Sequence, residues 1–81
     1  MTVSDSHLRT IKRQIKFGTK QDLPMMPGLA IKSAIDEHNI PARAWGYSGS
    51  YIGVETNRQY IFWRDEGHQL VFLGILNKED E

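Results

Sequence analysis

The chain has 81 residues, of which 40% are hydrophobic and 25% are charged, and its formal net charge is +0 at pH 7. This composition is that of an ordinary globular domain, which excludes an intrinsically disordered chain. There is no cysteine, which excludes a disulfide framework and a thiolate site. The length predicts one small domain over residues 1–81, and a domain of this size buries only about 60–65% of its unfolded surface.

The sequence also bears on where the protein resides. Residues 1–6 lack the apolar segment of a signal peptide. The longest apolar run, residues 70–76, is far too short to span a bilayer. Because cysteine is absent as well, we expect a cytoplasmic protein that has no contact with a membrane.

A first helix is predicted over residues 4–17. Ser4 or Ser6 can cap its N-terminus, because a serine hydroxyl accepts a hydrogen bond from a free backbone amide of the first turn. Gly18 follows at the position where a glycine commonly ends a helix. The apolar residues recur at helical spacing and form a single stripe that consists of Leu8, Ile11 and Ile15.

The opposite side of this predicted helix is basic, and residues 9–20 contain no acid. The basic side chains at helical spacing are Arg9, Arg13, Lys16 and Lys20. A solvated helix face is the commoner explanation of such a pattern. The alternative is a docking surface for phosphate or for an acidic partner, which makes Arg9, Arg13 and Lys16 candidate binding residues.

Residues 18–26 are predicted to form a connector, and residues 27–38 a second helix. Pro27 suits the first turn of a helix, where its missing amide hydrogen costs nothing. Asn39 suits the left-handed conformation that ends a helix, and Pro41 prevents its continuation. The predicted buried stripe of this helix is narrow and consists of Ala30, Ile31, Ala34 and Ile35.

Residues 43–76 are predicted to form an antiparallel meander of three or four strands, followed by an acidic tail over residues 77–81. The meander carries every aromatic residue except Phe17, and aromatic and β-branched residues suit a pleated, half-buried surface. Three turns divide it, at Ser48-Gly49, at Thr56-Asn57 and at Asp65-Glu66-Gly67.

The expected register gives the sheet two unlike faces. The first face carries Trp45, Ile52, Val54, Ile61, Trp63, Val71, Leu73 and Ile75. The second face carries Tyr51, Tyr60, Phe62 and Phe72, with glycines at 46, 53 and 74 between them and Arg58, Arg64 and His68 nearby.

The first face is the better core, because it has branched aliphatic side chains and no nearby charge. The predicted fold is therefore α+β, with two N-terminal helices packed on one face of the meander. The residues expected to be buried together are Ile31, Ile35, Ile52, Ile61, Trp63, Val71 and Leu73.

The sequence offers no catalytic, cofactor or metal site. The three histidines lie in different predicted elements and lack the spacing of zinc ligands. The carboxylates pair only as neighbours, at 36–37 and 65–66, and neighbours point apart rather than forming an acid/base pair. We therefore expect a protein that is not an enzyme, with no cofactor and no metal.

The second sheet face supplies the remaining candidate binding residues, which are Tyr51, Arg58, Tyr60, Phe62, Arg64 and Phe72. A helix or an N-terminal segment can cover these aromatic residues. Alternatively they bind a protein partner or a second copy of the chain, since Tyr, Phe and Arg are enriched at interfaces. They can also stack the bases of a single-stranded nucleic acid, which the neutral net charge disfavours. We expect a protein-binding or regulatory module that can form a homodimer.

The closing hairpin resembles that of RelE/ParE-type toxins over about a quarter of the chain. The resemblance is carried by YIFWR at 60–64 and by QLVFLGILNKED at 69–80. It implies a small ribonuclease, with Arg58, Arg64 and Lys78 as the residues to test. The chain departs from the pattern at Asn77 and Lys78, where those toxins often have His and Arg. It also has no clear strand before the helices, and it is neutral where such toxins are basic.

Overall fold

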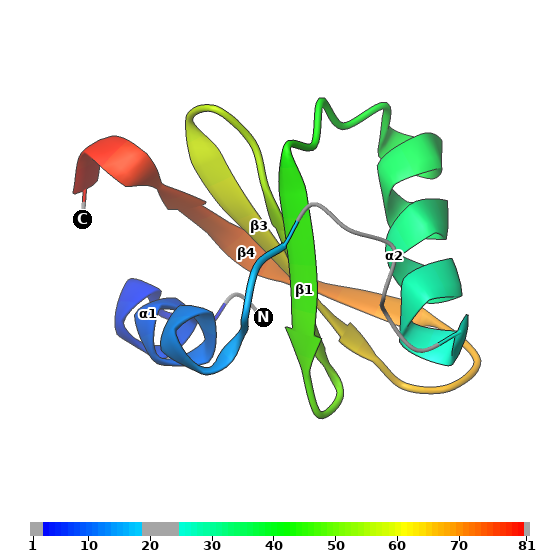
Figure 1. Ribbon diagram of the computed structural model, residues 1–81. Coiled ribbons are helices and arrows are strands. Elements are labelled where there is room, and N and C mark those ends of the chain that lie inside the picture. The colour runs from blue at the N-terminus through cyan, green and yellow to red at the C-terminus, as the bar shows by residue number, and fades with distance from the viewer. Residues whose placement is uncertain (1–2, 19–24, 81) are drawn as a thin grey trace.

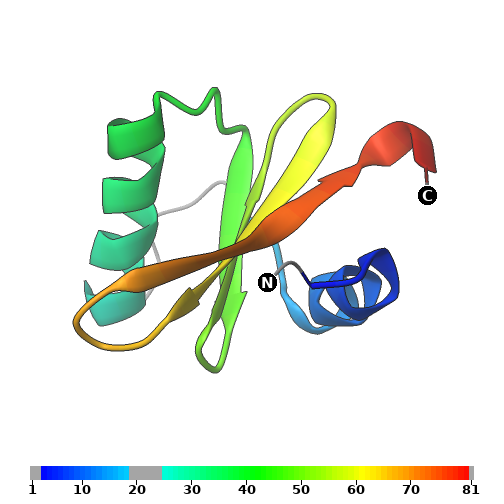
Figure 2. The same cartoon turned by 180° about the vertical axis from the view of Figure 1, so that it is seen from behind.

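The computed structural model describes the backbone of residues 3–18 and 25–80, and the side chains of residues 3–18 and 31–80. Helices α1 (Asp5–Gln14) and α2 (Met25–His38) precede four strands, β1 (Ala44–Ser48), β2 (Tyr51–Glu55), β3 (Gln59–Asp65) and β4 (Leu70–Asn77), and a 3-10 turn, η1 (Lys78–Asp80). The strands form one antiparallel sheet in the order β1-β2-β3-β4. The predicted α+β class is confirmed. The twisted sheet lies between the two helices (Figures 1 and 2).

Helix α1 begins as the sequence predicts and ends earlier. The Ser4 hydroxyl caps it by accepting a hydrogen bond of 3.3 Å from the amide of His7. The helix stops at Gln14, because Ile15 is extended, with ψ at 131°. The predicted end at residue 17 is therefore wrong. The extended segment runs beside β1, where Gly18 and Trp45 exchange two backbone hydrogen bonds of 2.8 and 3.0 Å.

Three glycines allow this N-terminal region to approach the sheet closely. A Cβ atom at position 46 would meet the carbonyl oxygen of Lys16 and lie 2.8 Å from Cγ2 of Ile15. A Cβ atom at Gly53 would lie 2.9 Å from the Phe17 ring, and one at Gly74 would lie 3.0 Å from Leu8. The glycines between the aromatic residues of the second face are thus the places where α1 and the segment after it pack.

Replacing Gly46 by Ala is expected to lower the free energy of unfolding by about 1–3 kcal/mol, because the added methyl group overpacks a site bounded by backbone. Gly18→Ala is the matched control, since a Cβ atom there meets nothing within 4 Å. Urea denaturation of the two variants measures the difference. Equal stabilities would contradict the close packing of this segment on β1.

Helix α2 ends where the sequence predicts. Asn39 has a positive φ of 51°, and the amide of Ile40 donates a hydrogen bond of 3.0 Å to the carbonyl of Ile35. The helix begins at Met25, two residues before the predicted start, so the last two residues of the predicted connector are helical. Residues 19–24 of that connector lie outside the described part of the chain.

The core consists of two layers, one on each face of the sheet. Around α1 the buried residues are Leu8, Ile11, Ile15, Phe62, Leu73 and Leu76. Around α2 they are Ile31, Ala34, Ile52, Val54 and Trp63. The structure does not confirm that both helices pack on one face, because it places α1 over the aromatic second face and α2 over the first. Both faces are apolar enough to require cover.

The register of β4 differs from the expected one, and this moves three side chains to the other face. The turn between β3 and β4 is longer than predicted, since Asp65 pairs with Leu70. An irregularity then shifts the register, so that Trp63 pairs with Phe72 while Phe62 pairs with Gly74. As a result Val71 lies opposite Arg64, Phe72 lies on the face of α2, and Leu73 joins the α1 layer.

The predicted core is therefore divided between the layers. Ile31, Ile52 and Trp63 are buried against α2, and Ile35 and Ile61 are partly buried against them. Leu73 is buried in the other layer, and Val71 is only partly buried. No helix in the described part of the chain is both long and apolar enough to cross a bilayer.

Candidate functional site

The most distinctive surface is an apolar groove between α2 and β4, with a volume of about 750 Å³. The strands contribute Ile61, Trp63, Phe72 and Ile75 to it, and the second half of α2 contributes Glu37 and His38. The Phe72 and Ile75 side chains are the two exposed large hydrophobic groups among the described residues, at 50% and 42% exposure. Here we call this surface the β4 groove.

The β4 groove exists because each helix covers a different part of the sheet. Helix α2 packs against β1 and β2, and α1 packs against β4 from the opposite face. On the sheet face that α2 packs against, the part formed by β3 and β4 is left partly open. Trp63 at the bottom of the groove is nevertheless buried, because two rings pack against it. The His38 ring stacks on it with the ring centres 6.1 Å apart, and the Phe72 ring meets it edge-on with the centres 6.2 Å apart.

The two edges of the sheet are also unlike. The outer edge of β1 is covered by Gly18, which exchanges both backbone hydrogen bonds with Trp45. At the outer edge of β4, the described residues add one backbone hydrogen bond, of 3.4 Å from the Val3 amide to the Leu73 carbonyl. The strand β4 reads LVFLGILN and contains no charge and no proline, although monomeric proteins commonly use such residues to protect an edge.

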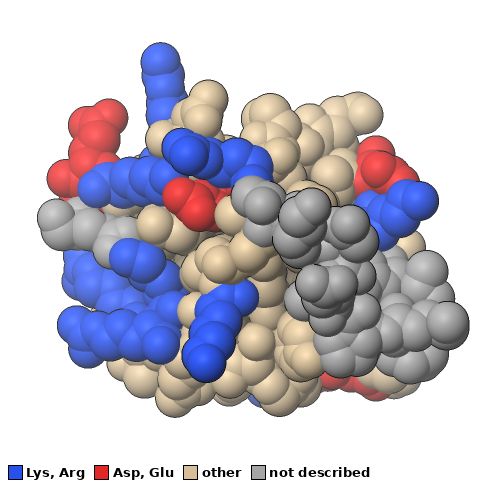
Figure 3. Space-filling view, viewed as in Figure 1, with Lys and Arg blue, Asp and Glu red and all other residues tan. Residues whose placement is uncertain are grey.

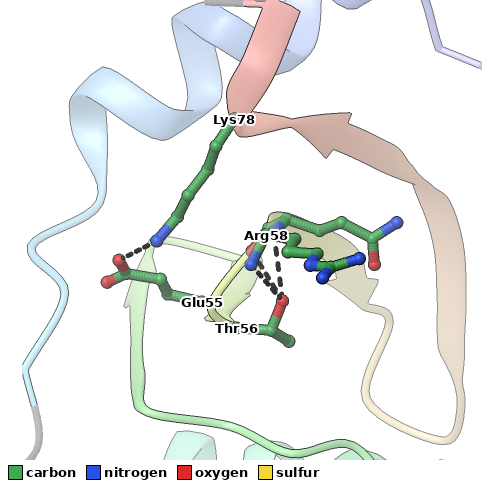
Figure 4. A network of polar contacts seen from close by, with 5 residues as sticks. Glu55, Thr56, Arg58 and Lys78 are labelled. Atoms are coloured by element: carbon green, nitrogen blue, oxygen red, sulfur yellow. Dashed lines mark hydrogen bonds and ion pairs between the residues drawn. The ribbon is translucent and has the colours of Figure 1, made fainter.

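A polar turn lies between β2 and β3, next to the end of β4 (Figure 4). The buried hydroxyl of Thr56 accepts hydrogen bonds from the amides of Arg58 and Gln59, at 3.3 and 3.0 Å. The amide of Lys78 donates to the carbonyl of Arg58 at 2.9 Å, and its ammonium group pairs with Glu55 at 2.6 Å. These bonds fix the backbone around Arg58 and leave its side chain exposed.

A shallow pocket of about 600 Å³ lies beside this turn. Arg58 lines it together with Asn57, Asn77, Glu79 and Asp80. The pocket thus holds one arginine and two acidic residues, and the negative charges oppose the tight binding of a phosphate group there.

Basic side chains gather over α1 (Figure 3). Arg9 donates a hydrogen bond of 2.9 Å to the carbonyl of Asp80. The ammonium groups of Lys12 and Lys78 lie over the ring of Tyr60, at 4.6 and 5.2 Å from its centre. Arg13 and Lys16 are exposed, so they are the side chains of this face that are best placed to meet a partner.

The candidate residues of the second sheet face do not form one binding surface. Phe62 is fully buried beneath α1, so it cannot contact a partner, and Tyr51 and Tyr60 are partly buried against the same layer. Phe72 is exposed on the opposite side of the sheet. Of the three explanations for this face, the structure supports the one in which a helix covers its aromatic residues.

The residues implied by the toxin resemblance are not gathered at one place. Arg58 and Lys78 are neighbours through their backbone hydrogen bond. Arg64 lies near the other end of β3, roughly 20 Å from Arg58 at the rise of an extended strand, where it pairs with Glu66 at 3.1 Å. Arg64 is therefore too far from Arg58 and Lys78 for the three side chains to act together on one phosphodiester.

Sequence reasoning missed the β4 groove, although two signals of it were present. The uncharged run from Leu70 to Asn77 indicated an unprotected edge strand. The narrow apolar stripe of α2 indicated a helix that covers only part of a sheet face. Ile75 was expected in the core, and its exposure depends on the position of α2, which no local pattern gives.

No family model matches the chain, and neither do any curated proteins or solved structures. Within the described residues, no group of three or more histidine or acidic side chains is arranged to hold a metal ion.

Proposed function

We propose that this chain is a protein-binding module that docks its partner at the β4 groove. The single observation that supports this most is that Phe72 and Ile75 are exposed on an edge strand that contains no charged residue. Exposed apolar patches next to polar rims are typical of protein interaction sites. An open strand edge adds backbone hydrogen bonds to such a contact.

Catalysis is not part of this proposal. The polar side chains nearest to the groove are Ser33, Glu37 and His38, and they come from one helix. A nucleophile with a base and an orienting group requires convergent side chains. The small ribonuclease suggested by the toxin resemblance has less support, because Arg64 is remote from Arg58 and Lys78.

Binding of single-stranded nucleic acid also has less support than binding of a protein. Base stacking requires exposed aromatic rings on a basic surface. In this fold the cluster of basic side chains lies on α1 and the segment that follows it, whereas the exposed ring of Phe72 lies on the other face of the sheet. Tyr60, which does lie beneath the basic side chains, already contacts two ammonium groups.

The double variant Phe72→Thr, Ile75→Thr tests the proposal. Threonine keeps the β propensity of both positions and removes most of their apolar surface. We expect the immobilised variant to lose the proteins that the wild-type chain captures from an extract of its host, because the anchors of an interface carry most of its binding energy. Mass spectrometry of the captured proteins measures the loss.

The matched control is Arg13→Glu, Lys16→Glu, which changes the basic face and leaves the groove intact. Its stability should stay within about 0.5 kcal/mol of the wild type, since exposed surface charges contribute little. We expect it to retain the captured proteins with only modest dependence on salt. If this variant lost them while the groove variant kept them, or if the wild type bound generic RNA with steep salt dependence, the proposal would be wrong.

A further inference from the structure

We infer that the occupant of the β4 groove is a second copy of this chain, paired edge to edge along β4 about a two-fold axis. This inference rests on the proposed function, because it assigns a partner to the same surface. With the axis perpendicular to the sheet, the second strand runs in the opposite direction, so the pairing would be antiparallel and the faces that α2 covers would lie on the same side. It would join the two sheets into one continuous sheet.

The unlike edges of the sheet fix the number of copies in this assembly. Gly18 already occupies the outer edge of β1 through two hydrogen bonds of 2.8 and 3.0 Å. Among the described strands, β4 is longer than β1 and its outer edge has one backbone hydrogen bond where β1 has two, so β4 is the more open edge. A contact that uses the same edge on both molecules closes after two copies, whereas a contact between different edges would continue into a fibre. The structure therefore favours a dimer over an open polymer.

The side chains of β4 suit a partner with the same surface. Phe72 pairs with Trp63 and Ile75 pairs with Ile61, so both exposed side chains lie on the face of the sheet that α2 partly covers. In a two-fold pair these residues and their copies lie on one continuous face. They can then bury one another beside the two α2 helices.

Charge does not oppose this self-association. The chain has a formal net charge of +0, and β4 contributes no charged side chain to its own edge. Like charges placed opposite each other would destabilise a two-fold contact, and here there are none along the strand. A strongly basic or acidic partner would find no complementary row of charges on β4.

The outer edge of β4 carries one backbone contact among the described residues. The Val3 amide reaches the Leu73 carbonyl at 3.4 Å, which is long for a hydrogen bond. The register shift at Leu73 and Gly74 divides the strand into two short stretches. Since short stretches give few hydrogen bonds, we expect association in the micromolar range rather than a permanent dimer.

Sedimentation equilibrium of the full chain tests this inference over a range of protein concentrations up to about 100 μM, where a micromolar dimer is largely assembled. We expect the mass to rise from that of the 9.3 kDa chain towards twice that value. Phe72→Lys should weaken self-association at least about tenfold, because it places a charge on the edge and on the face that becomes buried. The Arg13→Glu, Lys16→Glu variant should dimerise like the wild type.

A second measurement identifies the surface without relying on Phe72→Lys. The chain has no cysteine, so Ile75→Cys introduces a single thiol in the groove. A short bis-maleimide should crosslink this variant as a dimer much faster than it crosslinks Lys32→Cys, which places the thiol on the exposed side of α2.

The outcomes separate this inference from the proposed function. A mass that stays at 9.3 kDa throughout would overturn the second copy as partner, while captured host proteins that depend on Phe72 and Ile75 would still support the groove as a docking site. A dimer that is unchanged by Phe72→Lys, or one that crosslinks faster through Lys32→Cys, would also overturn the inference. If the wild-type chain neither self-associated nor captured host proteins, both the inference and the proposed function would be overturned.

Discussion

Phe62→Ala is expected to lower the free energy of unfolding by about 3–5 kcal/mol, as is typical when a buried aromatic side chain is truncated. Phe62 is 0% exposed at the centre of the layer beneath α1. A loss of this size is a large fraction of the stability of a small domain. Urea denaturation followed by tryptophan fluorescence would show the midpoint move to much lower urea, or the protein unfolded without urea.

Phe72→Ala is the matched control for this prediction, because the chemical change is the same and the side chain is 50% exposed. Its main internal contact is the edge-on approach to Trp63, so a cost of about 0.5–1.5 kcal/mol is expected. Both variants should be measured at a concentration at which the wild type sediments as a monomer. Equal losses would mean that Phe72 is as well covered as Phe62, which would contradict the open groove.

Ile52→Ala is the second large prediction and tests the layer beneath α2. Ile52 is 1% exposed and packs with Ile31 and Val54. Removing it should lower the free energy of unfolding by about 2–5 kcal/mol, through lost transfer energy and the cavity left behind. Thermal unfolding followed by circular dichroism, together with urea denaturation, would measure the change.

The control for Ile52→Ala is Ile75→Ala, since Ile75 is 42% exposed on the same face of the sheet. We expect the control to cost less than about 1 kcal/mol, because most of its side chain contacts solvent. If Ile52→Ala unfolded no more easily than Ile75→Ala, Ile52 would not be buried in the layer beneath α2.

The sequence predicted the helices and strands well, because local signals determine them. The cap at Ser4 and the left-handed Asn39 mark helix ends through backbone hydrogen bonding that involves only neighbouring residues. The expected registers of the first two turns differ from the observed ones by two residues. For example, Ile52 pairs with Trp63 rather than with Ile61. A shift of two leaves each side chain on its own face, so the face assignments of β1, β2 and β3 hold.

The faces of β4 could not be predicted in the same way. The longer turn before Leu70 and the register shift near Leu73 each change the pairing by an odd number of residues, and an odd shift exchanges the faces. The choice of sheet face by each helix is also a tertiary property. Ile15 and Phe17 pack at glycines in β1 and β2. The sequence contains those glycines, but it does not indicate which side chains pack against them.

The same limit applies to the candidate site. Composition identified the aromatic and arginine residues of β3 and β4, but it could not separate covered side chains from exposed ones. Phe62 and Phe72 look alike in the sequence, but α1 buries the first, whereas α2 covers only part of the opposite face and leaves the second exposed. The open edge of β4 could have been found from its lack of charge, because that property is local to the strand.

The contact between α1 and β4 has a consequence for the order in which the protein folds. The Val3 amide meets Leu73, and the Arg9 side chain meets Asp80 across 71 residues of sequence. During synthesis, Leu8 and Ile11 leave the ribosome long before Leu73 and Leu76 exist to cover them. The layer beneath α1 can therefore close only after the last strand has emerged. Because such long-range closure is slow, the apolar face of α1 stays uncovered until β4 has been made and has packed against it.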